Sequence, residues 1–153
     1  MVRLIDIAEP QRTFLQRMPM PEIADTPPAK GPALEERRVA IVTTAGLTTR
    51  ADSRFWMGST DYRVIPADAG AGDLIMSHAS INYDRSGFQQ DLNVVFPIDR
   101  LKELAAEGVI GSVADFHYSF QGAIDAELLE PAAAQLSGLL KKDAVDAVLL
   151  TPV

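Results

Sequence analysis

Two histidines are the residues of this 153-residue chain best suited to acid–base chemistry. His78 and His117 each stand at or near the end of an apolar, strand-like segment and beside a serine, Ser77 or Ser119. Histidine titrates near neutral pH, so it can serve as an acid, a base or a donor to an anion. We predict that both histidines lie at the rim of one site. The alternative is that each makes only structural hydrogen bonds.

The segment 82–100, NYDRSGFQQDLNVVFPIDR, combines charged and amide side chains with large apolar ones. Its candidates for a site are Asp84, Asp91, Asn93 and Arg100. A long polar loop anchored by apolar residues often carries function. Two alternatives remain: a solvated loop that caps the next helix near Asp99, and a metal site formed by Asp84 and Asp91 with the histidines. The spacing matches no known metal motif, so we predict no metal.

The segment Thr43-Thr44-Ala45-Gly46 follows an apolar run and could present hydroxyl groups and backbone N–H groups to an anion. We therefore add Thr44 to the candidate substrate-binding residues. A phosphate loop is excluded because there is no G-x-G-x-x-G or G-K-[ST] motif. A serine-hydrolase elbow, G-x-S-x-G, is absent as well.

Composition limits the classes of partner. Apolar residues make up 47% and charged residues 23% of the chain, which is typical of a soluble globular protein. The net charge of -7 argues against binding to nucleic acid or to an anionic membrane surface. No apolar run is long enough to span a membrane and no signal peptide is visible, so we expect a cytoplasmic protein. With no cysteine, the chain can form no disulfide and has no thiol nucleophile.

The pattern of apolar residues divides the chain into two parts. An apolar stripe at helical spacing, interrupted by Pro10, predicts a short helix within 4–18. Five of the ten prolines then fall between Pro19 and Pro32, which indicates an extended strap. We predict that residues 1–35 form this helix and strap, and that residues 36–153 form the main domain.

Within the main domain, strand-like and helix-like segments alternate. The strands are predicted at 38–45, 62–66, 73–78, 113–120 (with a piece at 109–110) and 147–151, the helices at 98–107 and 128–142, and residues 79–96 are predicted to be irregular. This order predicts an α/β fold of three layers: a mostly parallel sheet with helices on both faces, Rossmann- or flavodoxin-like, whose last strand lies at the C-terminus. Ligands of such sheets bind beyond the carboxyl ends of the strands. The segments after Ala45, His78, Phe120 and Thr151 should therefore form the site.

Six ordered blocks together resemble one known family. They are VAIVTTAG at 39–46, DYRVIP at 61–66, DLIMSH at 73–78, DLNVVFPIDRL at 91–101, GVIGSVADFHYSF at 108–120 and DAVLLTPV at 146–153. In this order they resemble the selenoprotein B family of glycine, sarcosine, betaine and D-proline reductases. The similarity covers roughly residues 36–153.

The resemblance implies reduction at the α-carbon of a small amino acid or betaine. The family uses a selenocysteine (or cysteine) as nucleophile, works with other reductase subunits that can carry a pyruvoyl group, and receives electrons from thioredoxin-type donors. From these matches and the arguments above we predict catalytic roles for His78, His117 and Asp84, and substrate-binding roles for Thr44, Asp91, Asn93, Arg100 and Ser119. No bound cofactor is predicted, and a homo-oligomer is possible.

One departure from the family lies at Val153. In the family the strand matching LLTPV is followed at once by the selenocysteine or cysteine, whereas this sequence stops there. Because selenocysteine is encoded by UGA, we hypothesise that a UGA codon was read as a stop, so that the domain is truncated and inactive alone. Two alternatives stay open: a non-catalytic small-molecule binding or assembly subunit, and an acid–base or metal-dependent enzyme that uses the histidines and aspartates.

Overall fold

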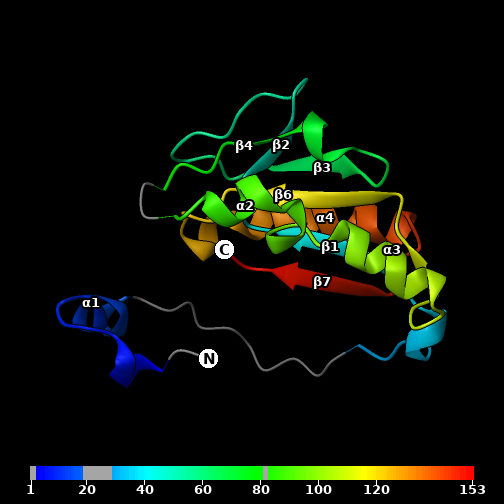
Figure 1. Ribbon diagram of the computed structural model, residues 1–153, viewed down its shortest axis with the longest axis horizontal. Coiled ribbons are helices and arrows are strands. Elements are labelled where there is room, and N and C mark those ends of the chain that lie inside the picture. Colours follow the sequence, from blue (N-terminus) through cyan, green and yellow to red (C-terminus); the bar gives the residue numbers. More distant parts are fainter. Residues whose placement is uncertain (1–2, 19–28, 81–82) are drawn as a thin grey trace.

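The computed structural model describes residues 3–18, 29–80 and 83–153, and its centre is a five-stranded mixed sheet (Figure 1). The strands of this sheet are β1 (Arg38–Thr43), β3 (Tyr62–Pro66), β5 (Ser112–Val113), β6 (Phe116–Phe120) and β7 (Ala147–Thr151). β1 pairs in parallel with β5, β6 and β7. Val39 is paired with both β5 and β7, and Val42 with both β6 and β7. β7 therefore occupies one edge of β1, while β5 and β6 share the other.

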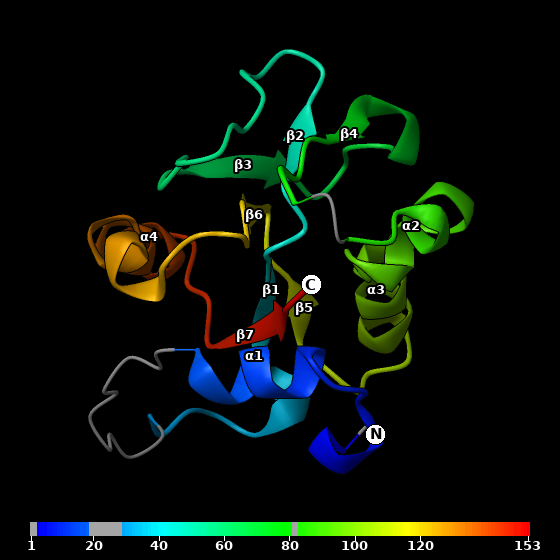
Figure 2. The same cartoon turned by 90° about the vertical axis from the view of Figure 1, so that its left-hand side faces the viewer.

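Two features distinguish the sheet from a fully parallel one. β3 is antiparallel to β6, with Ile65 opposite His117. In addition, β2 (Leu47–Thr49) and β4 (Leu74–Met76) form a separate two-stranded antiparallel sheet. The main sheet is strongly curled, and β2 and β4 lie beyond its β3 end (Figure 2).

Helices cover both faces of the main sheet (Figure 2). The helices are α1 (Gln11–Arg17), α2 (Ser86–Gln90), α3 (Ile98–Ala106) and α4 (Glu130–Lys142), with short 3-10 turns at Leu4–Asp6, Leu34–Glu36, Ala71–Asp73, Leu92–Val94 and Ala126–Leu129. Because side chains alternate along a strand, Ile41 packs in the core with Leu101 of α3, while Val42 packs on the side of Leu136 of α4. Burial on both faces explains why β1 is apolar at nearly every position.

The two long helices have the ends that their sequences predict. α3 begins after Pro97, and Gly108 adopts a positive φ of 73° two residues after its end. α4 carries Pro131 in its first turn and two lysines in its last. Leu101, Leu104 and Ala105 of α3 pack in one core cluster, and Leu136, Leu139 and Leu140 of α4 pack in the other.

The α/β class, the mostly parallel sheet, the helices on both faces and the C-terminal strand are confirmed. Several finer predictions were wrong. Residues 79–96 are not irregular throughout, since they contain α2 and a 3-10 turn; 109–110 forms no strand; and β2 was not predicted. The antiparallel β3 and the separate β2–β4 sheet also depart from a Rossmann- or flavodoxin-like order.

The predicted N-terminal helix is present as α1, and none of its residues is buried. Four of the strap prolines, Pro19, Pro21, Pro27 and Pro28, lie outside the described residues. No helix of the described ranges is both long and apolar enough to cross a membrane. β7 lies at the edge of the sheet, and Leu150 on it is 67% exposed.

Candidate functional site

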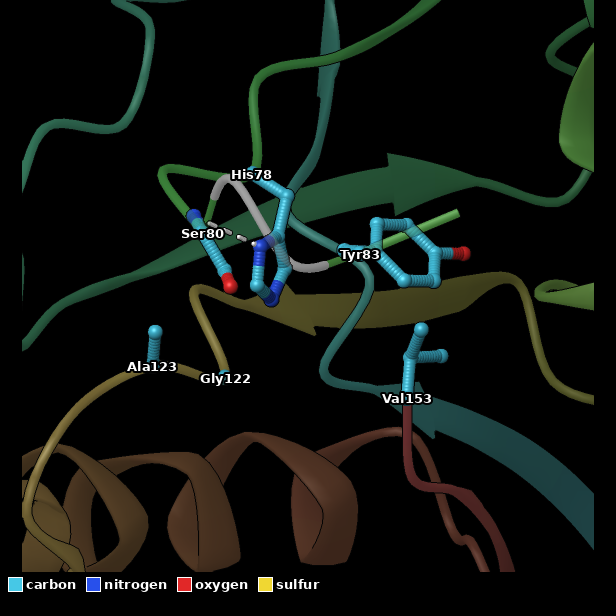
Figure 3. Close-up of a pocket in the computed structure, with 6 residues that line it drawn as sticks. All are labelled: His78, Ser80, Tyr83, Gly122, Ala123 and Val153. Atoms are coloured by element: carbon cyan, nitrogen blue, oxygen red, sulfur yellow. Dashed lines mark hydrogen bonds between the residues drawn. The ribbon is translucent and has the colours of Figure 1, made fainter. Parts of the chain in front are cut away.

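A cavity of about 260 Å³ lies beyond the carboxyl ends of the parallel strands β1, β6 and β7 (Figure 3). It is lined by His78, Ser80, Tyr83, Gly122, Ala123 and Val153. We call it the His78 pocket. Three of the four segments singled out from the sequence, those after His78, Phe120 and Thr151, supply this lining. The cavity is smaller than the ~300–1,000 Å³ typical of sites for drug-sized ligands, so its size suits a small molecule.

His78 presents a hydrogen-bond donor to this pocket. Its side chain is only 7% exposed, and its Nδ1 accepts a hydrogen bond of 3.1 Å from the backbone N–H of Ser80. Burial, together with the nearby charge of Arg85, lowers the pKa of the imidazole, so the ring is neutral near pH 7. A neutral ring whose Nδ1 accepts must carry its proton on Nε2.

The Nε2 atom of His78 has no partner among the described residues, although it is buried. Figure 3 shows the ring hanging into the space between Ser80 and the Gly122–Ala123 turn, with Nε2 at its free end. The Tyr83 ring lies beside it, with the two ring centres 5.1 Å apart. A buried donor without an acceptor is costly, so Nε2 is available to donate a hydrogen bond to an acceptor placed in the pocket.

Gln121 supplies a second unpartnered donor next to the pocket wall, and sequence reasoning missed it. The residue is fully buried, and its Oε1 accepts a hydrogen bond of 2.7 Å from the N–H of Ala123. Its Nε2 has no partner within the described part of the chain. The only signal in the sequence was a polar residue directly after the predicted strand at 113–120.

Thr44 holds the chain after β7 against the pocket. Its Oγ accepts a hydrogen bond of 2.8 Å from the N–H of Val153, and its backbone carbonyl accepts one of 3.1 Å from the N–H of Gly122. A side chain at Gly122 would place a Cβ 2.9 Å from the Cβ and carbonyl oxygen of Thr44, so this close approach requires glycine. Thr44 thus contacts two of the residues that line the pocket.

His117 and Ser119 lie inside the domain instead. His117 is fully buried on β6, where its Nδ1 accepts the N–H of Ile41 at 2.9 Å and its ring packs edge-on against Phe96. Burial lowers its pKa to about 4. Ser119 is also fully buried and accepts the N–H of Leu47 at 2.8 Å. Neither residue lines the His78 pocket, so the two histidines do not share it.

The aspartates of the 82–100 segment shape local turns. Asp84 accepts hydrogen bonds from the N–H and the hydroxyl of Ser86 at the start of α2, and these bonds lower its pKa. Asp91 accepts two hydrogen bonds of 2.9 Å from Asn93, which lower its pKa in the same way. Both carboxylates are therefore ionised near neutral pH.

Asn93 connects Asp91 to the first turn of α3. Its Nδ2 donates to Asp99 at 3.0 Å, and its Oδ1 accepts the N–H of Asp99 at 3.1 Å. Arg100, one residue further, is exposed and pairs with Glu103 at 2.7 Å. None of these residues lines the His78 pocket, and no group of three or more metal-ligating side chains occurs in the described ranges.

The fold and the site together define an α/β protein with a small pocket, holding one buried histidine donor, at the carboxyl ends of three parallel strands. The chain belongs to the glycine/sarcosine/betaine reductase selenoprotein B family, whose model matches residues 9–153. No solved structure matches it.

Curated relatives of the chain are named as reductase subunits. It is 39% identical to the D-proline reductase subunit gamma of Acetoanaerobium sticklandii over 121 residues, which cover 77% of this chain and 49% of that protein. It is 32% identical to the glycine reductase complex component B subunit gamma of Carboxydothermus hydrogenoformans, covering 90% of this chain and 33% of that one. The sarcosine reductase complex component B subunit beta of Peptoclostridium acidaminophilum is 31% identical, with the same coverage. The chain thus spans a third to a half of the length of these relatives.

Proposed function

We propose that this chain forms part of a selenol- or thiol-dependent reductase that acts on small amino acids or betaines. In this proposal the reacting selenium or sulfur belongs to the residue after Val153, and the His78 pocket receives the substrate. The observation that carries the proposal is the position of Val153. It lines the same pocket as the Nε2 of His78, which has no hydrogen-bond partner among the described residues. The proposal includes other reductase subunits, a thioredoxin-type electron donor and a cytoplasmic location.

The pocket fits such a group in two respects. Thr44 holds the N–H of Val153, so the next residue would start at the pocket wall. Selenolates and thiolates are anions, and a hydrogen-bond donor in a partly buried site stabilises them. His78 provides that donor with a neutral ring, and its Nε2 could equally bind the carboxylate of a substrate.

The net reaction fixes what must reach the site. One carbon–nitrogen bond at the α-carbon is broken and a carbon–hydrogen bond replaces it. The nitrogen leaves as a free amine from glycine, sarcosine or betaine, whereas in D-proline the ring opens and the nitrogen stays on the product as a primary amino group. Two electrons and two protons come from a dithiol, which becomes a disulfide. The 153 residues contain no cysteine, so on their own they supply no group that can exchange with a dithiol. Their role in the proposal is to bind and orient the substrate.

A second candidate function is favoured by that same absence of cysteine. A chain that keeps the His78 pocket and lacks a nucleophile could act as a non-catalytic binding or assembly subunit. The two candidates differ in what the gene encodes after Val153.

The test begins with the codon after Val153 and the frame that follows it. We expect a UGA codon, or a cysteine codon, followed by an open frame. When a dithiol and its partner subunits are supplied, the protein made from that frame should release amine from glycine, sarcosine or betaine, or open the ring of D-proline to a linear primary amine. A UAA or UAG codon with no further frame would overturn the reductase proposal and favour the binding subunit.

His78 is tested in the protein made from the whole frame. Replacing it by alanine removes the pocket donor and should lower kcat/KM by about 10²-fold or more, because a buried donor to a charged group is lost. Ser137→Ala, on the exposed face of α4, serves as the matched control and should leave kcat/KM unchanged. Equal activity of the His78→Ala protein and the control would contradict the assignment of this pocket.

A further inference from the structure

A second hollow, of about 420 Å³, lies where β4, α2 and the loop after β2 meet. Three arginines line it: Arg50 and Arg54 from the loop, and Arg85 just before α2. The remaining wall is mostly apolar and consists of Leu74–Met76 and Phe88, with Gln89 at its edge. We call this hollow the arginine pocket.

The arginines that line this pocket form no ion pair with a carboxylate of the described residues. Of the ten arginines in the described ranges, five form ion pairs: Arg3, Arg12, Arg38, Arg63 and Arg100. Three of the other five line this one hollow. This is unexpected in a chain with a net charge of -7, because acidic side chains are in excess.

The three guanidinium groups keep donors free for a ligand. Arg50 donates from Nε to the carbonyl of Gly72 at 2.8 Å. Arg85 uses Nη2 for the carbonyls of His78 and Ser80, at 2.6 and 3.0 Å. Arg54 makes no hydrogen bond or ion pair with any described residue. Each guanidinium has five N–H donors, so most of them are unused.

The acidic residues nearest in the sequence bind elsewhere. Asp52 accepts from the N–H and hydroxyl of Thr49, Asp73 from the N–H of Gly70, and Asp84 from Ser86. No acidic residue of the described part of the chain lines the hollow. The positive charge of the arginine pocket is therefore not neutralised from within the described chain.

We propose that the arginine pocket binds a small organic anion that carries a phosphate group, or two carboxylates, on an apolar body. Guanidinium groups match the planar, multiply accepting geometry of these oxyanions. The wall of Leu74–Met76 and Phe88 would cover the apolar body, as apolar linings do in most ligand sites. This site is separate from the His78 pocket, although Arg85 ties its edge to the His78 carbonyl.

The test is calorimetric titration of the chain with phenyl phosphate, phenylsuccinate and inorganic phosphate. At least one of the two phenyl compounds should bind with one-to-one stoichiometry and about tenfold more tightly than inorganic phosphate, because only these carry an apolar body. Which of the two binds distinguishes a phosphate site from a dicarboxylate site.

Substitution of one arginine locates the binding. Arg54→Gln should lower the affinity for the probe about tenfold, because one charge-assisted contact is lost. No hydrogen bond to another described residue is disturbed by this change. Arg17→Gln removes the same charge from an exposed position on α1 and should change nothing. The proposal is overturned if neither phenyl compound binds, or if both substitutions weaken binding equally, since that would indicate diffuse attraction to the surface.

Discussion

The side-chain oxygen of Thr44 accepts a hydrogen bond of 2.8 Å from the backbone N–H of Val153. Thr44 follows β1 and Val153 follows β7, so this bond joins the ends of two neighbouring parallel strands. It also fixes the last residue of the sequence at the wall of the His78 pocket. The contact therefore links the sheet to the site where we propose the chemistry to occur.

Replacing Thr44 by valine tests this link, because valine keeps the shape of threonine without the hydroxyl. We expect faster hydrogen exchange at the amide of Val153, together with a loss of about 1 kcal/mol in the free energy of unfolding. Thr44→Ser keeps the hydroxyl and should preserve the slow exchange. If the valine and serine proteins exchange this amide at the same rate, the hydrogen bond does not hold Val153.

Gly46 lies in close contact with the backbone of His78. It has a positive φ of 64°, and a Cβ there would lie 2.8 Å from the Cα and backbone nitrogen of His78. Gly46→Ala should lower the free energy of unfolding by about 1–3 kcal/mol, because strained backbone and a backbone clash combine. Urea unfolding measures this change.

Gly138→Ala is the matched control for that experiment. Gly138 lies within α4 with no atom near its Cβ position, so alanine should raise the free energy of unfolding by about 0.5–1 kcal/mol. A Gly46→Ala protein as stable as the unsubstituted one would mean that the backbone contact between Gly46 and His78 can open without cost.

The sequence was sufficient to predict the elements whose pattern is set by burial. β1, α3 and α4 have apolar spacings that only one element type satisfies, and all three were predicted close to their observed bounds. β2 and α2 are three and five residues long, and such short elements are determined by their neighbours more than by their own pattern. The antiparallel direction of β3 depends on contacts distant in sequence, which no local pattern encodes.

A pocket lies where the sequence predicted one, and His78 is the predicted site residue that lines it. The convergence of the segments after Phe120 and Thr151 follows from parallel strands, so the pocket is where the sheet rule places it. The sequence FHYSF alternates apolar and polar residues, which suggests that His117 is accessible. Both faces of β6 are covered, however, so His117 and Ser119 are buried on one face while Tyr118 and Phe120 are buried on the other.

Replacing Asn93 tests whether the hydrogen bonds of the 82–100 segment stabilise the fold. Asn93→Ala removes its bonds to Asp91 and Asp99 and should lower the free energy of unfolding by about 1–2 kcal/mol. Arg100→Gln breaks only an exposed ion pair with Glu103, so its effect should stay within about 0.5 kcal/mol. Chemical denaturation compares the two. A small effect of Asn93→Ala would mean that these hydrogen bonds do not stabilise the 82–100 segment.

Residues 1–153 alone should show no reductase turnover. The chain contains neither cysteine nor selenocysteine, and a thioether sulfur of methionine has no ionisable proton with which to replace them. With a dithiol donor, amine release from glycine, sarcosine and betaine and ring opening of D-proline should therefore equal the protein-free rates. Turnover above that rate in a preparation of verified mass would show that the chain has a nucleophile of another kind.

His117 should make stability depend on pH. Burial lowers its pKa in the folded protein from 6.5 to about 4, and Lys102 and Arg38 act in the same direction while Asp143 opposes them. Between these two pKa values the unfolded chain binds a proton that the folded protein does not. The contribution of His117 is thus fully present above pH 6.5 and is lost as the pH falls toward 4, by about 3 kcal/mol in total.

His117→Asn isolates this effect, because asparagine can still accept the N–H of Ile41 but does not titrate in this range. Urea unfolding at pH 7.5, 6 and 5 should show a smaller loss of stability with falling pH in the asparagine protein than in the unsubstituted one. His78 also has a lowered pKa, so both proteins should keep a residual slope. Parallel pH dependences would mean that His117 becomes protonated inside the fold without opposition, contrary to its burial.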